Sequence, residues 1–397
     1  MRLAKRLSLL PAILLLLSAC GGGAASSPPP PSSAPPASAA KPAASAAVST
    51  SAKPATSAAP AASGGAAAVR KEGPSFTFKL ASPSPESDLS GDGVKYWAKL
   101  VDERTGGRIK FQYFWAASLL NTTQMFQGVR DGLTDFAIPA TSYISGQVPD
   151  VAPFEVPFAY PTDPDLTLKF YREVEPILND IFTKSYNQRL VWSSPATTPD
   201  PVTCKNKFLD SQQAWQGALV RTAGKWQGAT VAAWGGKPVT IDLSEAYSSI
   251  QRGTADCLLL VYNLLDSVKL YEVAKNVTRI DHSINLQLVT ANSDAWNKIP
   301  APDQQILTQA GRETQDYLLK QRSDLVTKTI DKFKQNGVKV CTPSQQELTR
   351  LRAATEPVLA EIAKVQTDAG HKIQDIAKSY RDKVTKLGPT EGDMTPC

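Results

Sequence analysis

The sequence has little of the residue type that most often carries proton transfer and metal binding. It contains only two histidines, His282 and His371, in 397 residues. A histidine-rich zinc site is therefore excluded, and no HExxH, GxSxG or Walker motif occurs. A histidine-dependent triad through His282 is a weak alternative, because a lone histidine is more often structural or exposed. The Gly-x-Gly at 91–93 is followed by Tyr96 where a dinucleotide fingerprint needs glycine.

Most of the chain carries no net charge. The total is +6, but residues 1–20 carry +3 and residues 21–73 another +3, so residues 74–397 sum to zero. Nucleic acid binding depends on clustered Lys and Arg that neutralise phosphates. A nucleic acid is therefore not expected as the main partner. The remaining length is enough for one large or two medium domains, each with a real core.

No segment is long and apolar enough for a transmembrane helix. The longest candidate, 7–19, has 13 residues behind a basic start, which is typical of the apolar part of a secretory signal. The following Leu17-Ser-Ala-Cys20-Gly21 resembles the bacterial lipoprotein cleavage box, in which the cysteine becomes an acylated N-terminus. The alternative is an ordinary signal peptide with an incidental cysteine. We expect a signal peptide over 1–20 and anchoring to membrane lipid through Cys20, in the periplasm or on the outer face of the cell membrane.

The segment after Cys20 is built from three small residue types. Residues 21–70 contain 19 Ala, 10 Ser and 9 Pro, with no Leu, Ile or aromatic residue. Such a composition buries too little apolar surface to offset the entropy of ordering the chain. Residues 21–73 are therefore predicted to be a disordered linker, stiffened locally by proline.

The body of the chain starts with alternating strand and helix patterns. The expected elements are strands over 76–80, 109–115 and 133–138, and helices around 94–101 and 122–129, the latter capped by Asn121. This order predicts a parallel α/β sheet, in which ligands bind beyond the carboxyl ends of the strands. Thr141 follows the last of these strands and is a candidate for a ligand-binding hydroxyl. A plain loop threonine is an equally good interpretation.

The second half shows further strands and two long helices. Strands are predicted over 217–221, 256–262 and 284–290, with a helix over 244–252. The two long helices are predicted over 302–336 and from 342 to about 380, the second with an interruption near Gly370.

Several collinear motifs resemble one known family. They are Glu103-Arg-Thr-Gly-Gly-Arg-Ile-Lys110, Met125-Phe-Gln-Gly-Val-Arg-Asp-Gly-Leu-Thr-Asp-Phe-Ala137, Val148-Pro-Asp-Val-Ala-Pro-Phe-Glu-Val-Pro-Phe158, Trp215-Gln-Gly-Ala-Leu-Val-Arg221, Trp234-Gly-Gly-Lys-Pro-Val239, Leu243-Ser-Glu-Ala-Tyr247, Ile250-Gln-Arg-Gly-Thr-Ala-Asp256 and Leu270-Tyr-Glu-Val-Ala-Lys275. Their order and spacing resemble the extracytoplasmic solute receptors of TRAP transporters, the dicarboxylate-binding-protein family. The resemblance covers essentially Phe76 to Tyr380.

The resemblance implies an α/β, two-lobed periplasmic-binding-protein-like fold of type II, with long C-terminal helices bracing both lobes. Lobe I is expected over 74–200 plus about 260–300, and lobe II over 201–259 plus about 301–397. The lobes would close on a small organic acid and hand it to a small and a large integral membrane subunit. The resemblance implies no enzymatic activity, no cofactor and no metal.

Arg221 corresponds to the arginine that binds the ligand in this family. A guanidinium presents paired donors that fit a carboxylate. The alternative is an ordinary surface arginine at a strand end.

The sequence departs from the family pattern at two places. Asp200 stands where many members have a second arginine, and an apolar run that includes Leu258 and Leu260, then Tyr262, replaces a polar Gly-Gln-Glu-Asn-Pro segment. A second carboxylate on the ligand would lack a counter-charge in a dry cleft. We therefore expect a monocarboxylate with an apolar or aromatic body. Asp200 would meet an amine or hydroxyl of the ligand, or it is a solvated turn aspartate.

Three aromatic residues are candidate walls of the cleft, namely Trp115, Trp192 and Tyr262. The alternative for each is a place in the core, which is the commoner position of such side chains.

Four cysteines besides Cys20 occur in this exported chain, which favours disulfides but allows three pairings. Cys204 and Cys257 both fall beside the expected crossover strands between the lobes, while Cys341 precedes the last long helix and Cys397 ends the tail. We favour the pairs Cys204 with Cys257 and Cys341 with Cys397.

Other functions stay open at this point. A receptor for an ABC transporter or for a membrane sensor kinase would have the same binding lobes. An exported lipoprotein hydrolase is less favoured, because it would need an activated nucleophile and a base.

Overall fold

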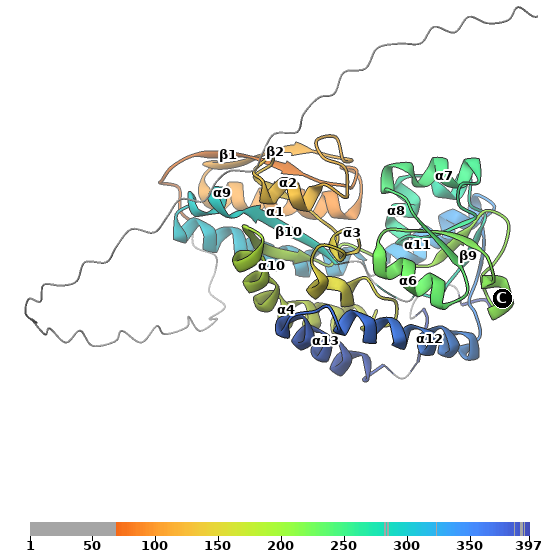
Figure 1. Cartoon of the computed structure of the whole chain (residues 1–397). Coiled ribbons are helices and arrows are strands. Elements are labelled where there is room, and N and C mark those ends of the chain that lie inside the picture. Colours follow the sequence, from red (N-terminus) through yellow and green to blue (C-terminus); the bar gives the residue numbers. More distant parts are fainter. Residues whose placement is uncertain are drawn as a thin grey trace, which may run out of the picture. The chain divides into compact units, whose positions relative to one another are not determined.

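A computed structural model describes residues 69–397, except 282, 284, 285, 323, 385, 390, 391 and 393 (Figure 1). The predicted signal peptide, Cys20 and nearly all of the predicted linker lie outside the described residues, and so does His282. The described part is α/β and contains two separate sheets. We call the half built on the five-stranded sheet lobe I and the half built on the six-stranded sheet lobe II. None of the described helices is long and apolar enough to cross a membrane.

The sheet of lobe I is mixed. Its order is β2-β1-β3-β10-β4, with β1 Phe76–Ala81, β2 Ile109–Phe114, β3 Phe136–Ala137, β4 Gln188–Ser194 and β10 Gln287–Asn292. Strands β1, β2 and β3 are parallel, as the alternating pattern predicts. Strand β10 is antiparallel to both β3 and β4, because the chain returns through it from lobe II.

Helices cover the sheet of lobe I. They are α1 Leu89–Thr105, α2 Met125–Arg130, α3 Thr141–Ile144, η1 Pro149–Phe154, α4 Pro164–Ser185, α9 Ser293–Asn297 and α10 Ala301–Arg322. Helix α1 ends at Gly106, whose φ of 63° is the left-handed conformation that glycine adopts without strain. The expected cap Asn121 lies one turn before α2, where its side chain accepts a hydrogen bond from the Gln124 amide at 2.9 Å.

The sheet of lobe II has the order β11-β9-β5-β8-β6-β7. Its strands are β5 Val202–Cys204, β6 Leu219–Thr222, β7 Lys237–Thr240, β8 Cys257–Leu259, β9 Asn276–Thr278 and β11 Lys339–Cys341. The helices of this lobe are α5 Gln212–Trp215, α6 Lys225–Ala233, η2 Leu243–Glu245, α7 Ala246–Arg252, α8 Tyr262–Ser267, η3 Leu270–Glu272 and α11 Leu325–Gln335. Strand β6, which carries Arg221, lies between its parallel neighbours β8 and β7, and β7 is the edge strand of this sheet.

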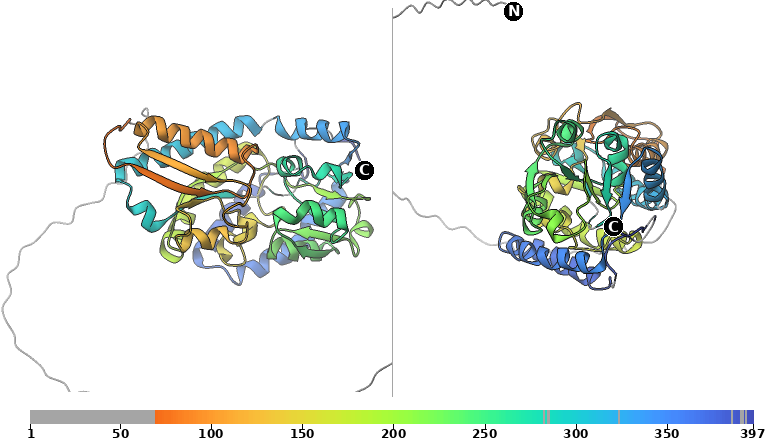
Figure 2. Two further views of the ribbon diagram at one scale, coloured as in Figure 1. Left: turned by 90° about the horizontal axis from the view of Figure 1, so that it is seen from above. Right: turned by 90° about the vertical axis from the view of Figure 1, so that its right-hand side faces the viewer.

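The lobes differ from the expected boundaries at two places. Strand β9 and helix α8, expected in lobe I, belong to lobe II, because β9 pairs with β5 and β11 and α8 packs in the same core. The helix expected over 302–336 is two helices that pack on different lobes. Leu307 and Leu318 of α10 lie in the core of lobe I, whereas Val326 and Phe333 of α11 lie in the core of lobe II. Figure 2 shows the two helices following one another along one side of the folded unit.

Two C-terminal helices, α12 Gln345–Ala363 and α13 Asp368–Arg381, brace both lobes. Helix α12 contacts α6 of lobe II and η1 of lobe I, while α13 contacts α4 and η1 (Figure 1). The interruption expected near Gly370 falls before α13 instead. Gly370 lies within the first turn of α13. A Cβ at this position would be 2.3 Å from Oδ1 of Asp150, so glycine is what allows α13 to pack closely on η1.

The four described cysteines form two disulfides with the pairing that the sequence favours. Cys204 and Cys257 are directly opposite each other on antiparallel strands β5 and β8. Cys341, at the end of β11, is joined to the C-terminal Cys397. The first disulfide fastens two neighbouring strands in the core of lobe II, and the second fastens the tail to the edge of that sheet.

Candidate functional site

Polar side chains gather where the strand ends of the two lobes meet. In lobe I they follow β1, β3 and β4, and in lobe II they follow or end β6 and β8. Buried polar residues at these positions are Ser82, Ser84, Thr141, Ser142, Thr197, Thr198, Asp200, Arg221 and Asn263. Buried polar groups are costly unless they are hydrogen-bonded. Such a concentration at the carboxyl ends of strands is typical of a ligand site in an open α/β sheet.

Arg221 on β6 is the central cation of this region. Its side chain has no exposed surface, so the interpretation as an ordinary surface arginine is wrong. Nε donates to the carbonyl of Ile241 at 2.9 Å and Nη1 to the carbonyl of Leu259 at 3.3 Å. The Leu259 carbonyl ends β8 and the Ile241 carbonyl directly follows β7, so the plane of the guanidinium is fixed from both sides.

Tyr143 of lobe I completes the surroundings of Arg221. Nη2 of Arg221 donates to the Tyr143 hydroxyl at 2.6 Å, and the guanidinium carbon lies 6.0 Å from the centroid of the tyrosine ring. Burial raises the pKa of Tyr143, against the opposing effect of the Arg221 charge, so the phenol stays protonated. A guanidinium has five N–H groups, of which three are used in these contacts, and within the described part of the chain the other two are available to a further acceptor.

Asp200 is buried rather than solvated. It has no exposed surface, which makes the solvated-turn interpretation wrong. Oδ2 accepts a hydrogen bond from Oγ of Ser283 at 2.9 Å. Burial raises the pKa of Asp200 to about 7, while the Ser283 hydrogen bond and the Arg221 charge oppose this rise. At neutral pH the carboxyl group is thus close to its midpoint of protonation, and only its protonated form can donate a hydrogen bond.

Thr141 begins helix α3 directly beyond β3, two residues before Tyr143. Its side chain is buried, and among the described residues Oγ1 has no hydrogen-bond partner. Leaving a buried hydroxyl unsatisfied costs about 1–3 kcal/mol. This hydroxyl is therefore suited to contact a polar group of a ligand at the strand end.

Two of the expected wall residues have other roles. Trp192 lies in the core of lobe I, 6.1 Å from the ring of Trp97. Tyr262 is buried and bonded to an ion pair: its hydroxyl donates to Oδ1 of Asp281 at 2.8 Å and accepts from Nε of Arg279 at 3.0 Å. Packing in the core fixes Trp192, and hydrogen bonding to the ion pair fixes Tyr262.

The other predicted apolar residues, Leu258, Leu260 and Trp115, lie in different parts of the structure. Leu258 and Leu260 belong to the hydrophobic core of lobe II, and the ring of Tyr143 packs against that same cluster. Trp115 is half-buried beyond β2, the edge strand of lobe I, where it stacks on Tyr113 with ring centroids 5.0 Å apart. The structure thus brings the two leucines and Tyr143 together, and leaves Trp115 at the sheet edge.

A second polar bridge between the lobes was not predicted from the sequence. Nδ2 of Asn263, on α8, donates to Oδ1 of Asp88 at 2.9 Å, and Asp88 also caps helix α1 of lobe I. Oδ1 of Asn263 accepts from the Thr198 hydroxyl at 3.0 Å. A hollow of about 450 Å³ opens beside this bridge. The only sequence signal for it was the helix-capping position of Asp88.

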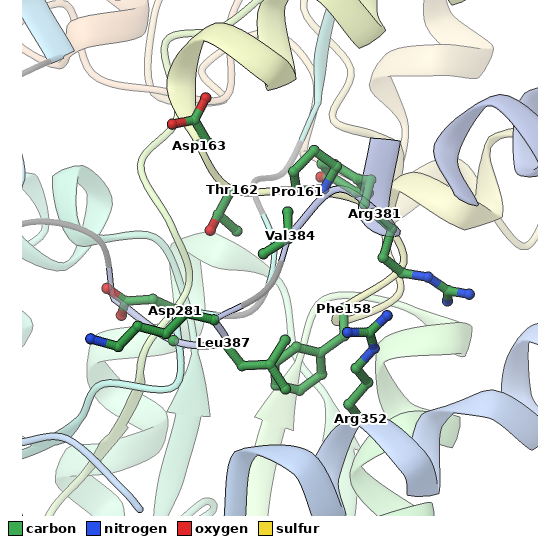
Figure 3. A pocket seen from close by; sticks show the side chains of 12 residues that line it. Phe158, Pro161, Thr162, Asp163, Asp281, Arg352, Arg381, Val384 and Leu387 are labelled. Carbon is green, nitrogen blue, oxygen red and sulfur yellow. The ribbon is translucent and has the colours of Figure 1, made fainter. Parts of the chain in front are cut away.

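A smaller cavity of about 50 Å³ lies next to the C-terminal helices α12 and α13. Figure 3 shows Phe158, Val384 and Leu387 in its lining together with Arg352 and Arg381. It has room for only a few water molecules. None of the predicted ligand-binding residues lines it, so it is distinct from the Arg221 site.

Two α/β lobes with a buried arginine where they meet define a receptor of the periplasmic-binding-protein type. Residues 80–366 match the DctP family model, described as bacterial extracellular solute-binding protein, family 7. The chain therefore belongs to this family of solute-binding receptors, which confirms the resemblance read from the motifs. Among the described residues, no group of three or more His, Cys, Asp or Glu side chains is placed to hold a metal ion.

Curated relatives share about a fifth of their residues with this chain. The ectoine-binding periplasmic protein TeaA of Halomonas elongata is 22% identical over 316 residues, covering 77% of this chain and 90% of that protein. The sialic acid-binding periplasmic protein SiaP of Vibrio cholerae is 22% identical over 286 residues, covering 72% and 88%. The matches span both lobes, so the similarity concerns the whole receptor.

Solved structures confirm the two-lobed fold. A TRAP periplasmic solute-binding protein from Desulfovibrio salexigens with bound orotic acid matches with a TM-score of 0.73 at 20% identity, covering 78% of this chain and 99% of that one. DctP7 of Bordetella pertussis, a receptor binding pyroglutamic acid, matches with a TM-score of 0.72 at 19% identity, covering 77% and 100%.

Proposed function

We propose that this protein is the extracytoplasmic receptor of a TRAP-type transporter and binds a small organic acid between its lobes through Arg221. The observation that carries the proposal is the position of Arg221. It is a buried guanidinium held by two carbonyls of lobe II and by Tyr143 of lobe I. Its two remaining N–H groups suit the two oxygens of a carboxylate. Family membership and the organic acids named for similar receptors, pyroglutamic and orotic acid, support the same class of ligand.

The ligand we propose is a monocarboxylate with an apolar or aromatic body. Asp200 supports this choice, because it is buried within the electrostatic reach of Arg221 and supplies no positive counter-charge for a second carboxylate. The ring of Tyr143 and the side chains of Leu258 and Leu260 form one apolar cluster that suits such a body. Thr141 and Asp200 would contact a hydroxyl or amine on the ligand.

A thermal-shift screen of mono- and dicarboxylates tests this proposal. A ligand at 100 times its dissociation constant stabilises the folded protein by about 2.7 kcal/mol, which is readily detected. Pyroglutamate, orotate and aromatic monocarboxylates are expected to raise the unfolding midpoint more than succinate or malate does. A clear response to succinate with no response to any monocarboxylate would contradict the assignment of Asp200.

The receptor is proposed to be lipid-anchored and to deliver its ligand to a small and a large membrane subunit. The lipoprotein-like box at Cys20 and the linker at 21–73 support an anchor with a spacer. Mass spectrometry of the mature N-terminal peptide is expected to find a diacylglycerol group on Cys20, and Cys20→Ala is expected to release the protein from membranes. Neighbouring genes for the two multispanning subunits would support the transporter.

A further inference from the structure

Helix α6 of lobe II starts with a glycine, three residues after Arg221, and its first turn lacks a side-chain cap. The cap position is Gly224, with φ of −153°. This is an extended conformation that any residue adopts, so the local backbone does not require glycine. The first amides of a helix have no partner within the helix and need an acceptor from elsewhere.

Lobe I supplies that acceptor. Oε1 of Glu155, just beyond η1, accepts a hydrogen bond from the amide of Gln227 at 2.8 Å, and the carboxyl group also interacts with the amide of Trp226. Oε2 of Glu155 is hydrogen-bonded to Oγ of Ser145. Glu155 is 1% exposed, and its hydrogen bonds join the start of α6 to two segments of lobe I.

Gly224 is fitted to the same contact. A Cβ atom at this position would lie 1.9 Å from the carbonyl oxygen of Ser142 and 2.7 Å from Oε1 of Glu155. Because Ser142 contributes backbone, no side-chain rotation relieves that overlap. The neighbouring Tyr143 is the residue that bonds Arg221. The space that a side chain would need at Gly224 is therefore taken by the segment of lobe I that also contacts the ligand-binding arginine.

The indole of Trp226 adds an apolar contact. It is 4% exposed and belongs to a hydrophobic cluster of lobe I that includes Ile144 and Phe154. Nζ of Lys225 lies 4.3 Å from the centroid of its ring. The start of α6 is thus docked on lobe I by a backbone contact, a buried carboxyl group and an aromatic side chain.

We propose that Gly224 and Glu155 form the contact that sets the closed position of lobe II, and so position Arg221 beside Tyr143. Glu155 replaces the missing helix cap only while the lobes are together, and glycine at 224 leaves room for the lobe I backbone. The two are positioning residues for the ligand site. The inference deepens the proposed function, because it says how Arg221 is brought to the ligand.

The protonation of Glu155 fits this role. Burial raises the pKa of Glu155 to about 8, against the hydrogen bonds from Ser145 and from the two α6 amides and against the charge of Lys225. The carboxyl group is therefore mainly neutral at pH 7. Oε1 accepts from the α6 amides and Oε2 accepts from the Ser145 hydroxyl, and glutamine is an isostere that preserves the acceptor for the amides.

Amide hydrogen exchange of the full chain without added ligand tests the proposal. In the wild type, the amides of Trp226 and Gln227 are expected to exchange roughly tenfold more slowly than in Gly224→Ala, in which the added methyl group separates the lobes. Amides of β6 are expected to be unchanged. Gly228→Ala is the matched control, because a Cβ at Gly228 in the same helix meets its nearest atom at 3.5 Å.

A second pair of variants keeps the test valid if Gly224→Ala fails to fold. Glu155→Gln is expected to retain the protection and Glu155→Val to lose it. Equal exchange in Gly224→Ala and the wild type would overturn the proposal, and so would equal exchange in Glu155→Val and the wild type. No organic acid is used, so either result leaves the carboxylate proposal untouched, and failure of Arg221 to bind a carboxylate would leave the exchange pattern unchanged.

Discussion

The hydroxyl of Tyr143 and Nη2 of Arg221 lie 2.6 Å apart although the two residues belong to different lobes. The bond exists only where α3 of lobe I meets β6 of lobe II. A ligand bound to Arg221 is thus next to a residue of the opposite lobe. In the proposed function, an acid bound to Arg221 would contact both lobes and stabilise their closed arrangement, since each lobe supplies part of one hydrogen-bonded cluster.

Tyr143→Phe is expected to weaken binding of the acid that gives the largest thermal shift by about tenfold. The change removes the acceptor of a buried Arg221 N–H, and an unsatisfied buried group costs about 1–3 kcal/mol. Isothermal titration measures the effect. Tyr113→Phe, on the edge strand β2, is the control and is expected to bind like the wild type. Unchanged affinity in Tyr143→Phe would show that the hydroxyl does not hold the arginine in the bound state.

Asp200 is expected to make the stability depend on pH. Its pKa is raised to about 7 in the folded protein from an ordinary value of 3.8. The folded state thus holds a proton that the unfolded state releases, and stability is lost as pH rises from about 4 to about 7. Asp200→Asn is expected to remove this loss and to be more stable than the wild type at pH 8, by at least about 1 kcal/mol.

Urea unfolding at pH 4.5, 6 and 8 measures the pH dependence, with the exposed Asp165→Asn as control. A wild-type stability that rises between pH 6 and 8 relative to Asp200→Asn would contradict the raised pKa. Because Arg221 lowers the pKa of Asp200, the acid that neutralises Arg221 is also expected to raise it and to be bound together with a proton.

Gly311→Ala is expected to destabilise lobe I. A Cβ at Gly311 of α10 would lie 2.5 Å from Cγ of Trp192. Overpacking of a core costs about 1–3 kcal/mol, which exceeds the gain of up to about 1 kcal/mol from replacing glycine in a helix. Gly146→Ala is the control, because a Cβ there meets no atom within 4 Å. Thermal unfolding that leaves Gly311→Ala as stable as Gly146→Ala would contradict the core position of Trp192.

The Cys204–Cys257 disulfide is expected to contribute more to stability than to ligand specificity. It closes a sequence separation of 53 residues between buried neighbouring strands, and removing such a link typically costs about 2–5 kcal/mol. The paired change Cys204→Ala with Cys257→Ala is expected to lower the free energy of unfolding by that amount and so to lower the urea midpoint. Cys341→Ala with Cys397→Ala is expected instead to make the tail after α13 a site of proteolysis. Equal urea midpoints for the Cys204→Ala, Cys257→Ala variant and the wild type would contradict the expected contribution of this disulfide to stability.

Much of the fold could be predicted because local patterns and global fold agree. The strand before Ala81, the helix ended by Gly106 and the strand that carries Arg221 all follow the expected periodicity. The break between α10 and α11 could not be predicted, because both halves keep an apolar face and only the two lobes distinguish them. The partition of strands between two sheets likewise depends on long-range pairing, which one sequence does not reveal.

Part of the candidate site could be predicted from family motifs. Arg221 was proposed because the motif over 215–221 resembles the strand that carries the ligand-binding arginine of the family. Nothing in the sequence singles out Tyr143, and the motif that contains Glu155 does not reveal its contact with α6. Asp200 was predicted as a candidate site residue. Its burial could not be predicted, because residues distant in sequence such as Ser283 pack against it. For Trp192 the sequence left a wall of the cleft and a place in the core as alternatives, since a buried tryptophan has the same sequence pattern in both, and the structure places it in the core of lobe I.

The most direct test of the ligand site is titration of Arg221→Ala and Arg221→Lys with the acid that gives the largest thermal shift. Arg221→Ala is expected to lose detectable binding. Arg221→Lys is expected to bind at least about tenfold more weakly, because an ammonium lacks the paired donors. Circular dichroism checks that both variants are folded. Binding of that acid by folded Arg221→Ala with wild-type affinity would contradict the central role of this arginine.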